Sequence, residues 1–147
     1  MKQILCVVDL SESTEKVLEM GARIASAWKA HLIILYPYRL IDYGHRGDMS
    51  TLRRRLESEA REKFYTLQRT LPGIDSVSCE FKPEIGFVAD RVIDYVKKHS
   101  VDMVVISQPE SDPGDDLKSF DVQDLIKNSK LPFVIVPCEV NAEANIV

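Results

Sequence analysis

The 147-residue sequence predicts an α/β fold: a doubly wound, five-stranded parallel sheet with helices on both faces. Three observations predict it. Short apolar runs rich in β-branched residues recur along the chain, as in strands that are buried on both faces of a sheet. Amphipathic stretches with helical spacing separate these runs. The length suits one domain, and a composition of 45% apolar and 29% charged residues is that of a globular protein.

The first two strands flank an amphipathic helix. Ile4–Val8 is a continuous apolar run, and a turn of Asp, Ser and Thr residues at 9–14 supplies side chains that suit a helix N-terminus. The helix that follows carries its apolar face from Val17 to Trp28. Leu32–Tyr36 is the second buried strand, and we expect Pro37 to end it.

A loop and a long charged helix come next. Residues Tyr38–Ser50 contain two glycines among polar residues, which favours a loop. The helix begins at Met49 and ends before Pro72-Gly73. Its basic cluster, Arg53–Arg55, is followed by glutamates and is interpreted as a solvated face rather than a phosphate-binding patch.

The second half of the chain supplies three strands and two helices. Val77–Phe81 alternates apolar and polar residues, as a half-exposed edge strand does. Val88–Val96 is the third helical stripe, and Val101–Ile106 is the fourth strand. Val122–Ile126 indicates a short fourth helix, and Pro132–Val136 is the fifth strand. We therefore predict one domain over residues 1–138, and a C-terminal tail, 139–147, that frays.

Composition excludes several functions. The six glycines do not cluster, which excludes a Walker or Rossmann phosphate loop. A net charge of −4 argues against a general affinity for nucleic acid. Three cysteines without metal-ligand spacing favour reduced thiols and no metal site. The apolar runs are too short for a membrane span, and no signal peptide is recognisable, so we expect a cytoplasmic protein with no membrane partner.

In a doubly wound sheet, ligands bind beyond the carboxyl ends of the strands. The segments to consider are therefore the four that follow strands, namely Asp9–Thr14, Tyr36–Arg39, Pro83–Phe87 and Ser107–Phe120.

Several of these stretches resemble one family. The first strand and its Ser-rich turn read ILCVVDLSES, the second strand reads HLIILYPY, a later stretch reads GFVADRVIDYVKKHSVDMVVIS, and the last strand reads LPFVIVP. In this order and spacing, over about residues 2–138, the sequence resembles the universal stress protein family. The resemblance implies the sheet order 3-2-1-4-5 of an adenine nucleotide alpha hydrolase-like fold, and a homodimer.

The family contains an ATP-binding group and a group that does not bind ATP. Members of the first carry Gly, two residues, Gly, about nine residues and then Gly-Ser or Gly-Thr after the fourth strand. Here the first two glycine positions fall on Ser107 and Glu110, and the final pair falls on Ser119 and Phe120. Gly114 lies out of register. The sequence therefore resembles the group that does not bind ATP.

The same loop carries four carboxylates, Glu110, Asp112, Asp115 and Asp116, which would face the phosphates of ATP. At ~4 Å and an effective dielectric constant of ~20, each like charge costs about 4 kcal/mol before screening. A bound cation would reverse this effect, but the spacing matches no known calcium or magnesium loop. A solvated acidic loop is the simpler interpretation.

The adenine side of the site is also altered. In the ATP group, backbone atoms at the end of the second strand hold the adenine edge, and the matching residue here, Pro37, has no N–H. Asp9 matches the family's Asp after the first strand, although an Asx turn or a helix cap also explains it. We therefore predict no cofactor, with ATP and magnesium as the alternative.

Other side chains point to no catalytic site. His31 and His99 precede strands at the amino end of the sheet, and His45 lies in a loop, so we expect no catalytic triad and no enzyme activity. Cys6 should behave as a small apolar residue in a buried strand. An aromatic and basic group after the second strand suits contact with a partner, contact with an anionic small molecule, or a surface loop packed on the edge of its own sheet; its members are Tyr36, Tyr38, Arg39, Tyr43 and Arg46.

Two other proteins with this kind of sheet fit poorly. A response-regulator receiver needs paired acids after strand one, an Asp after strand three and a Lys after strand five; the sequence has only Asp9, then Lys82 and Pro137. A flavodoxin needs a glycine in its phosphate loop, and Ser11–Thr14 has none. Neither function is expected.

The sequence thus predicts a dimeric stress-response or regulatory module without a glycine-rich ATP loop. The alternative is an ATP-binding universal stress protein with a modified phosphate loop that acts as a nucleotide-dependent switch or slow ATPase. The resemblance implies a homodimer paired through the uncharged fifth strand, with Phe133 and Ile135, or Val134 and Val136, alternating across the interface. The stress, the protein partner, any small ligand and any phosphorylation site stay open.

Overall fold

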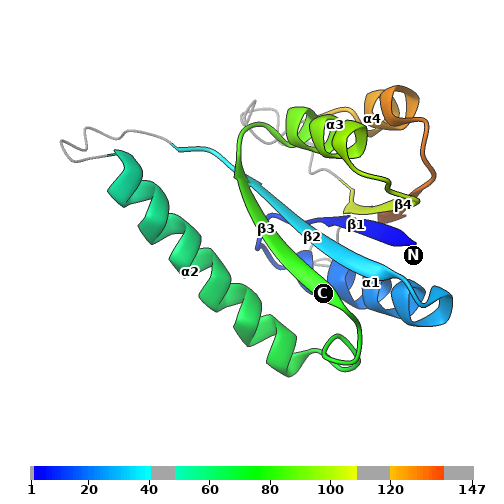
Figure 1. Ribbon diagram of the computed structural model, residues 1–147, viewed down its shortest axis with the longest axis horizontal. Coiled ribbons are helices and arrows are strands. Elements are labelled where there is room, and N and C mark those ends of the chain that lie inside the picture. Colours follow the sequence, from blue (N-terminus) through cyan, green and yellow to red (C-terminus); the bar gives the residue numbers. More distant parts are fainter. Residues whose placement is uncertain (1, 41–48, 109–119, 138–147) are drawn as a thin grey trace, which may run out of the picture.

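The computed structural model describes residues 2–40, 49–108 and 120–137 (Figure 1). Its elements alternate between strands and helices along these segments. They are β1 (Gln3–Val7), α1 (Thr14–Trp28), β2 (His31–Tyr38), α2 (Met49–Thr70), β3 (Cys79–Ile85), α3 (Val88–Lys98), β4 (Met103–Ser107), α4 (Val122–Ser129) and β5 (Phe133–Val136).

The five strands form one parallel sheet in the order β3-β2-β1-β4-β5. Helices α1 and α2 cover one face, and α3 and α4 cover the other (Figure 1). The predicted doubly wound fold and its implied strand order are therefore confirmed. In the described residues, no helix is both long and apolar enough to cross a membrane.

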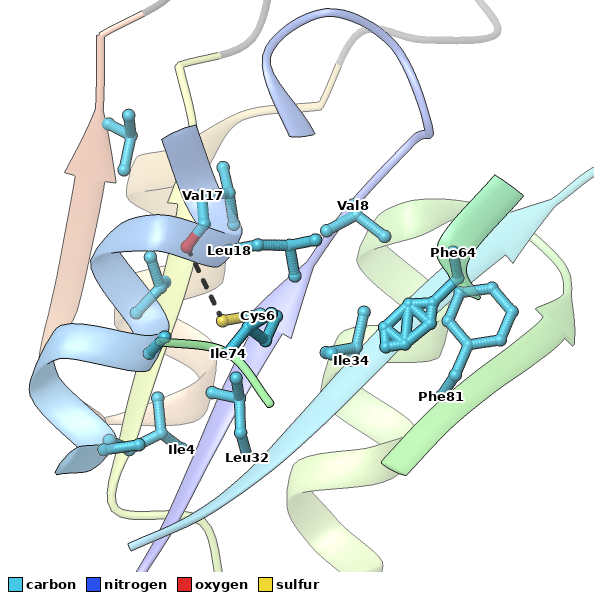
Figure 2. Packing of buried hydrophobic residues seen from close by; sticks show 14 of the residues in the cluster. Ile4, Cys6, Val8, Val17, Leu18, Leu32, Ile34, Phe64, Ile74 and Phe81 are labelled. Carbon is cyan, nitrogen blue, oxygen red and sulfur yellow. Dashed lines mark hydrogen bonds between the residues drawn. The ribbon is translucent and has the colours of Figure 1, made fainter. Parts of the chain in front are cut away.

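The core lies on both sides of the sheet because the central strands alternate their side chains between the two helical layers. In β1, Ile4 and Cys6 pack toward α1 and α2, and Leu5 and Val7 pack toward α3 and α4. In Figure 2, the Cys6 thiol points toward α1, where it donates to the Val17 carbonyl oxygen at 3.9 Å. The thiol is fully buried, which raises its pKa and makes it a packing group, as the sequence predicts.

The expectation that Pro37 ends the second strand is wrong. Pro37 lies inside β2, which continues to Tyr38. Odd-numbered backbone groups of β2 face β1, since His31 N–H donates to the Lys2 carbonyl oxygen at 2.8 Å and Val8 N–H donates to the Leu35 carbonyl oxygen at 2.9 Å. The backbone of Pro37 would be the next to face β1, but the pairing of β1 with β2 ends at Val7 and Leu35. The missing N–H therefore leaves no gap in the ladder.

Strand β3 also continues beyond the prediction, from Cys79 to Ile85, although it contains Pro83. Even-numbered backbone groups of β3 face β2, because Leu32 N–H donates to the Ser78 carbonyl oxygen and Gly86 N–H donates to the Tyr38 carbonyl oxygen. Position 83 therefore faces the free edge of the sheet, where proline is tolerated and discourages pairing with another chain.

Candidate functional site

The carboxyl edge of the sheet is where this fold places ligands, at the point between β1 and β4 where the strand order reverses. Four of the sequence-predicted residues lie along it. Asp9 follows β1, Pro37 lies near the end of β2, Ser107 ends β4, and Phe120 precedes α4. Ser119 and the four loop carboxylates lie outside the described residues, as do Tyr43, Arg46, His45 and the predicted tail.

The Asp9 carboxylate is engaged in the turn that follows β1. Its Oδ1 accepts from the Ser11 N–H at 2.9 Å, from the Ser11 hydroxyl at 2.5 Å and from the Thr14 hydroxyl at 3.3 Å. This is the Asx-turn arrangement that the sequence offered as one explanation of Asp9. The turn also places Leu10 at φ 60°, a left-handed conformation that a non-glycine residue rarely adopts. Asp9 therefore organises the approach to α1.

Pro37 offers no hydrogen-bond donor to a ligand. It is buried in β2, next to Tyr36, and its ring nitrogen faces the side on which β1 has already ended. Burial, and then the nearby Asp9 carboxylate, raise the pKa of Tyr36, so this phenol stays protonated. The end of β2 therefore offers no backbone donor at position 37, and the Tyr36 phenol beside it is neutral.

Ser107 is paired within the sheet at the end of β4. It is half-buried and lies in register with Val136 of β5. The N–H of Gln108, which follows Ser107, donates to the Val136 carbonyl oxygen at 2.8 Å. Phe120 is partly buried against the core between the sheet and helices α3 and α4. A phenylalanine packed in this way contributes apolar contact and no phosphate-binding hydroxyl.

The N-terminus of α4 is capped by a side chain that the sequence analysis missed. The Asp121 carboxylate accepts from the Gln123 N–H at 2.9 Å, and Asp124 adds a second carboxylate in the first helical turn. The free N–H groups of a helix N-terminus are the usual phosphate ligands at this place in the fold. The detectable signal was an Asp directly before the apolar stripe that begins at Val122.

A hydrogen-bonded cluster fastens the start of α2 to the end of β2. The buried Tyr38 hydroxyl donates to the Glu57 carboxylate at 2.5 Å, and Arg53 Nε donates to the same carboxylate oxygen at 3.1 Å. The Tyr38 ring also stacks on Tyr36, with 5.7 Å between ring centroids. Burial, and then Glu57, raise the pKa of Tyr38. This cluster gives part of the predicted aromatic and basic group a role in packing.

Changing Tyr38 to phenylalanine is expected to lower the free energy of unfolding by about 1 kcal/mol, because a hydrogen bond to a partly screened carboxylate is lost. Urea unfolding measures this loss, and amide exchange should accelerate in the first turns of α2. Tyr65→Phe, at an exposed tyrosine of the same region, is the control and should change neither. Equal losses in the two variants would contradict the role of the cluster.

The effect of Tyr38→Phe should depend on pH. Burial opposes ionisation of Glu57, but the hydrogen bonds from Tyr38 and Arg53 outweigh it and hold the pKa of Glu57 below its ordinary 4.5. The ionised carboxylate thus stabilises the fold above pH 4.5, and this stabilisation is lost as the pH falls through the lowered pKa. The difference between wild type and Tyr38→Phe should therefore shrink in acid, whereas a constant difference would exclude Glu57 as the partner.

A serine, a histidine and a glutamate meet at the amino end of the sheet, which the sequence analysis did not expect. His31 Nδ1 lies 2.7 Å from the Ser78 hydroxyl, and His31 Nε2 lies 3.9 Å from the Glu80 carboxylate. Ser78 and Glu80 are exposed, and the group lies at the edge opposite the ligand crevice. The arrangement ties the turn before β3 to the start of β2.

In the part of the chain that the structure describes, no three His, Cys, Asp or Glu side chains are arranged so that they could hold a metal ion. Cys6 and Cys79 are both free thiols. Cys138 lies outside the described residues.

Strand β5 forms one edge of the sheet. Its even-numbered backbone groups face β4, since Val104 N–H donates to the Pro132 carbonyl oxygen at 3.1 Å and Val136 accepts from Gln108. The backbone groups of Phe133 and Ile135 therefore face outward. The Ile135 side chain is 41% exposed, an unusual fraction for a large apolar residue in a strand.

Comparison with known proteins agrees with this architecture. The sequence model of the universal stress protein family matches residues 1–137 of this chain. Universal stress protein A homolog 1 of Coxiella burnetii is 27% identical in an alignment of 111 residues that covers 71% of this chain and 74% of that protein.

Solved structures share the fold. Universal stress protein UspA from Lactobacillus plantarum has a TM-score of 0.69 at 16% identity, covering 92% of this chain and 97% of its own. A universal stress protein in complex with cAMP has a TM-score of 0.63 at 19% identity, covering 92% and 96%. The family match over almost the whole sequence, together with the sheet order, establishes that this chain belongs to the universal stress protein family.

Proposed function

We propose that this universal stress protein is a dimeric, non-enzymatic regulatory module of the cytoplasm that works without a glycine-rich ATP loop. The observation that supports this most strongly is the Asp121 carboxylate at the N-terminus of α4. It takes a backbone N–H that a phosphate group would need. Asp124, in the first turn of the same helix, adds a second negative charge.

The residues around α4 support the same function. Phosphate loops need glycines because backbone N–H groups must close around the oxygens. Ser107, Glu110, Ser119 and Phe120 stand at the family's glycine-motif positions. Pro37 removes a donor on the adenine side. The electrostatics and the missing donors thus act together against a nucleoside triphosphate.

The free edge at β5 supports a homodimer. Pairing of two β5 strands across a twofold axis would satisfy the outward backbone groups of Phe133 and Ile135. It would also cover the exposed Ile135 side chain, while Val134 and Val136 pack toward α1. We propose these four β5 residues as the interface, with Ile135 contributing the largest newly buried area.

The alternative function is a nucleotide-dependent switch or slow ATPase that binds ATP with magnesium through a modified loop. Two observations favour keeping it. The related structure with cAMP shows that the fold accepts a nucleotide in that protein. Asp9 retains the family's residue after β1. In this alternative, the carboxylates between residues 109 and 119 would hold the magnesium ion.

Isothermal titration of the full chain with ATP and magnesium separates the two functions. The module is expected to give no binding heat up to millimolar ATP. Saturable micromolar binding would contradict it and support the switch. In that case, Asp9→Ala should abolish the binding, whereas Glu12→Ala, at an exposed acidic residue of the same turn, should leave it unchanged.

A further inference from the structure

A groove of about 450 Å³ separates α3 from α4 on the face opposite α1 and α2. Its apolar lining includes Val88, Ile93, Phe120 and Leu125. Leu125 is buried, and the other three are half-buried against the core, so the floor of the groove is a continuation of the core that remains open to solvent. The volume falls within the range of specific binding sites.

The charges that line the groove are all negative. Asp90 comes from the first turn of α3, Asp124 comes from the first turn of α4, and Asp121 caps α4. No Lys or Arg is among the described residues that line it. An apolar floor with an acidic rim is complementary to an apolar side chain flanked by positive charges.

Phe87 adds an exposed aromatic ring at the mouth of the groove. Its side chain is 46% exposed although it lines the groove together with buried Leu125. The Arg39 guanidinium lies 4.0 Å from the centre of this ring and holds it by a cation–π contact. An exposed, fixed aromatic residue beside an apolar hollow is typical of a protein-binding surface.

We propose that the α3–α4 groove binds a basic amphipathic helix of a partner protein, with an apolar anchor on the floor and Lys or Arg side chains against the three aspartates. This inference rests on the proposed role as a regulatory module and names its binding surface. A helix is favoured over an extended peptide because the free strand edges, β3 and β5, lie elsewhere, whereas two helices border the groove.

Two features argue for a separate partner. The tail at 139–147 contains two glutamates and no Lys or Arg, so its charge matches that of the rim and it is a poor occupant. A second copy that pairs at β5, as proposed above, would use an edge of the sheet, whereas the groove lies between α4 and α3, which contacts β2.

The probe is a fluorescein-labelled, 14-residue helical peptide of leucine and lysine, with leucines at i, i+3, i+4 and i+7. Fluorescence anisotropy at low salt should give micromolar binding. The same peptide with glutamate in place of lysine should bind at least tenfold more weakly. Amide chemical shifts of the unmodified protein should change around Phe87, Ile93 and Leu125. Shift changes elsewhere, or equal binding of the two peptides, would overturn the assignment.

Charge reversal supplies the matched control. Asp90→Lys with Asp124→Lys should weaken peptide binding at least tenfold, whereas Glu19→Lys with Asp75→Lys, at exposed acidic positions away from the groove, should not. Asp121 is left in place because it caps α4. Equal losses in both double variants would indicate attraction to net charge alone and overturn the groove assignment. Concentration-dependent shifts at the groove without peptide would instead assign it to a second copy.

These outcomes are independent of the ATP titration. If the protein does not bind ATP and the peptide changes amide chemical shifts outside the groove, the proposed function stands and the groove assignment is wrong. If the protein binds ATP and also binds the peptide in the groove, the groove assignment stands and the proposed function is wrong.

Discussion

Replacing Ile135 by lysine is expected to convert the protein from dimer to monomer at concentrations where wild type is dimeric. The Ile135 side chain is 41% exposed on the free edge of β5, so the change removes an apolar contact and leaves the core intact. Across a twofold axis, it also brings two lysines close to each other. A central apolar contact of 2–3 kcal/mol corresponds to an increase of about 100-fold in the dissociation constant. Light scattering over a concentration series measures it.

The matched control for this prediction is Gln123→Lys. Gln123 is exposed on α4, so its replacement by lysine adds the same charge on a helix rather than on the edge strand. It should leave the dimer unchanged, and circular dichroism should show both variants folded. A dimer that survives Ile135→Lys would exclude this edge as the interface.

Replacing Gly21 by alanine is expected to lower the free energy of unfolding by up to about 2 kcal/mol, although alanine is the better helix former. An added Cβ would overlap the Cys6 sulfur and would lie 3.2 Å from Leu32 Cδ1. Overpacking of a filled core costs about 1–3 kcal/mol, and the gain in helix propensity offsets about 1 kcal/mol of it. Urea unfolding measures the net loss. Ser26→Ala, on the exposed face of α1, carries the propensity gain alone and should be neutral or stabilising.

The clash with Cys6 can be tested by removing its sulfur. In the double variant with Cys6→Ala, the alanine methyl group at position 21 occupies space that the thiol has left. We therefore expect the double variant to be more stable than Gly21→Ala alone, with a coupling energy of about 0.5–3 kcal/mol. Strictly additive losses would show that the cost arises elsewhere in α1.

The fold was largely predictable because its signals are local. Ile4–Val8 and Leu32–Tyr36 have no polar residue to interrupt them, and only a strand buried on both faces accommodates such runs. The strand boundaries were less predictable. Pro37 and Pro83 look like strand breakers in the sequence, but both occupy positions where no ladder hydrogen bond is needed. That property depends on which neighbour a strand has and where the neighbour ends.

The candidate site was predictable only where a residue acts within its own turn. The Asx turn of Asp9 joins residues two to five positions apart, and an Asp followed by Ser and Thr residues is typical of such a turn. The acidic cap of α4 has a local sequence signal as well, an Asp directly before the apolar stripe that begins at Val122. The His31–Ser78 contact spans 47 positions, and the α3–α4 groove joins helices that a strand separates in sequence. Contacts of this kind are set by strand register and helix packing, which no single segment encodes.

Native mass spectrometry of the full chain, purified without added nucleotide and then mixed with ATP and magnesium, tests the central claim most directly, because one spectrum reports both subunit number and bound ligand. We expect a dimer at twice the mass of the 16.7 kDa chain, with no added nucleotide mass before or after mixing. A species carrying one ATP per chain, whether copurified or added, would contradict a nucleotide-independent module.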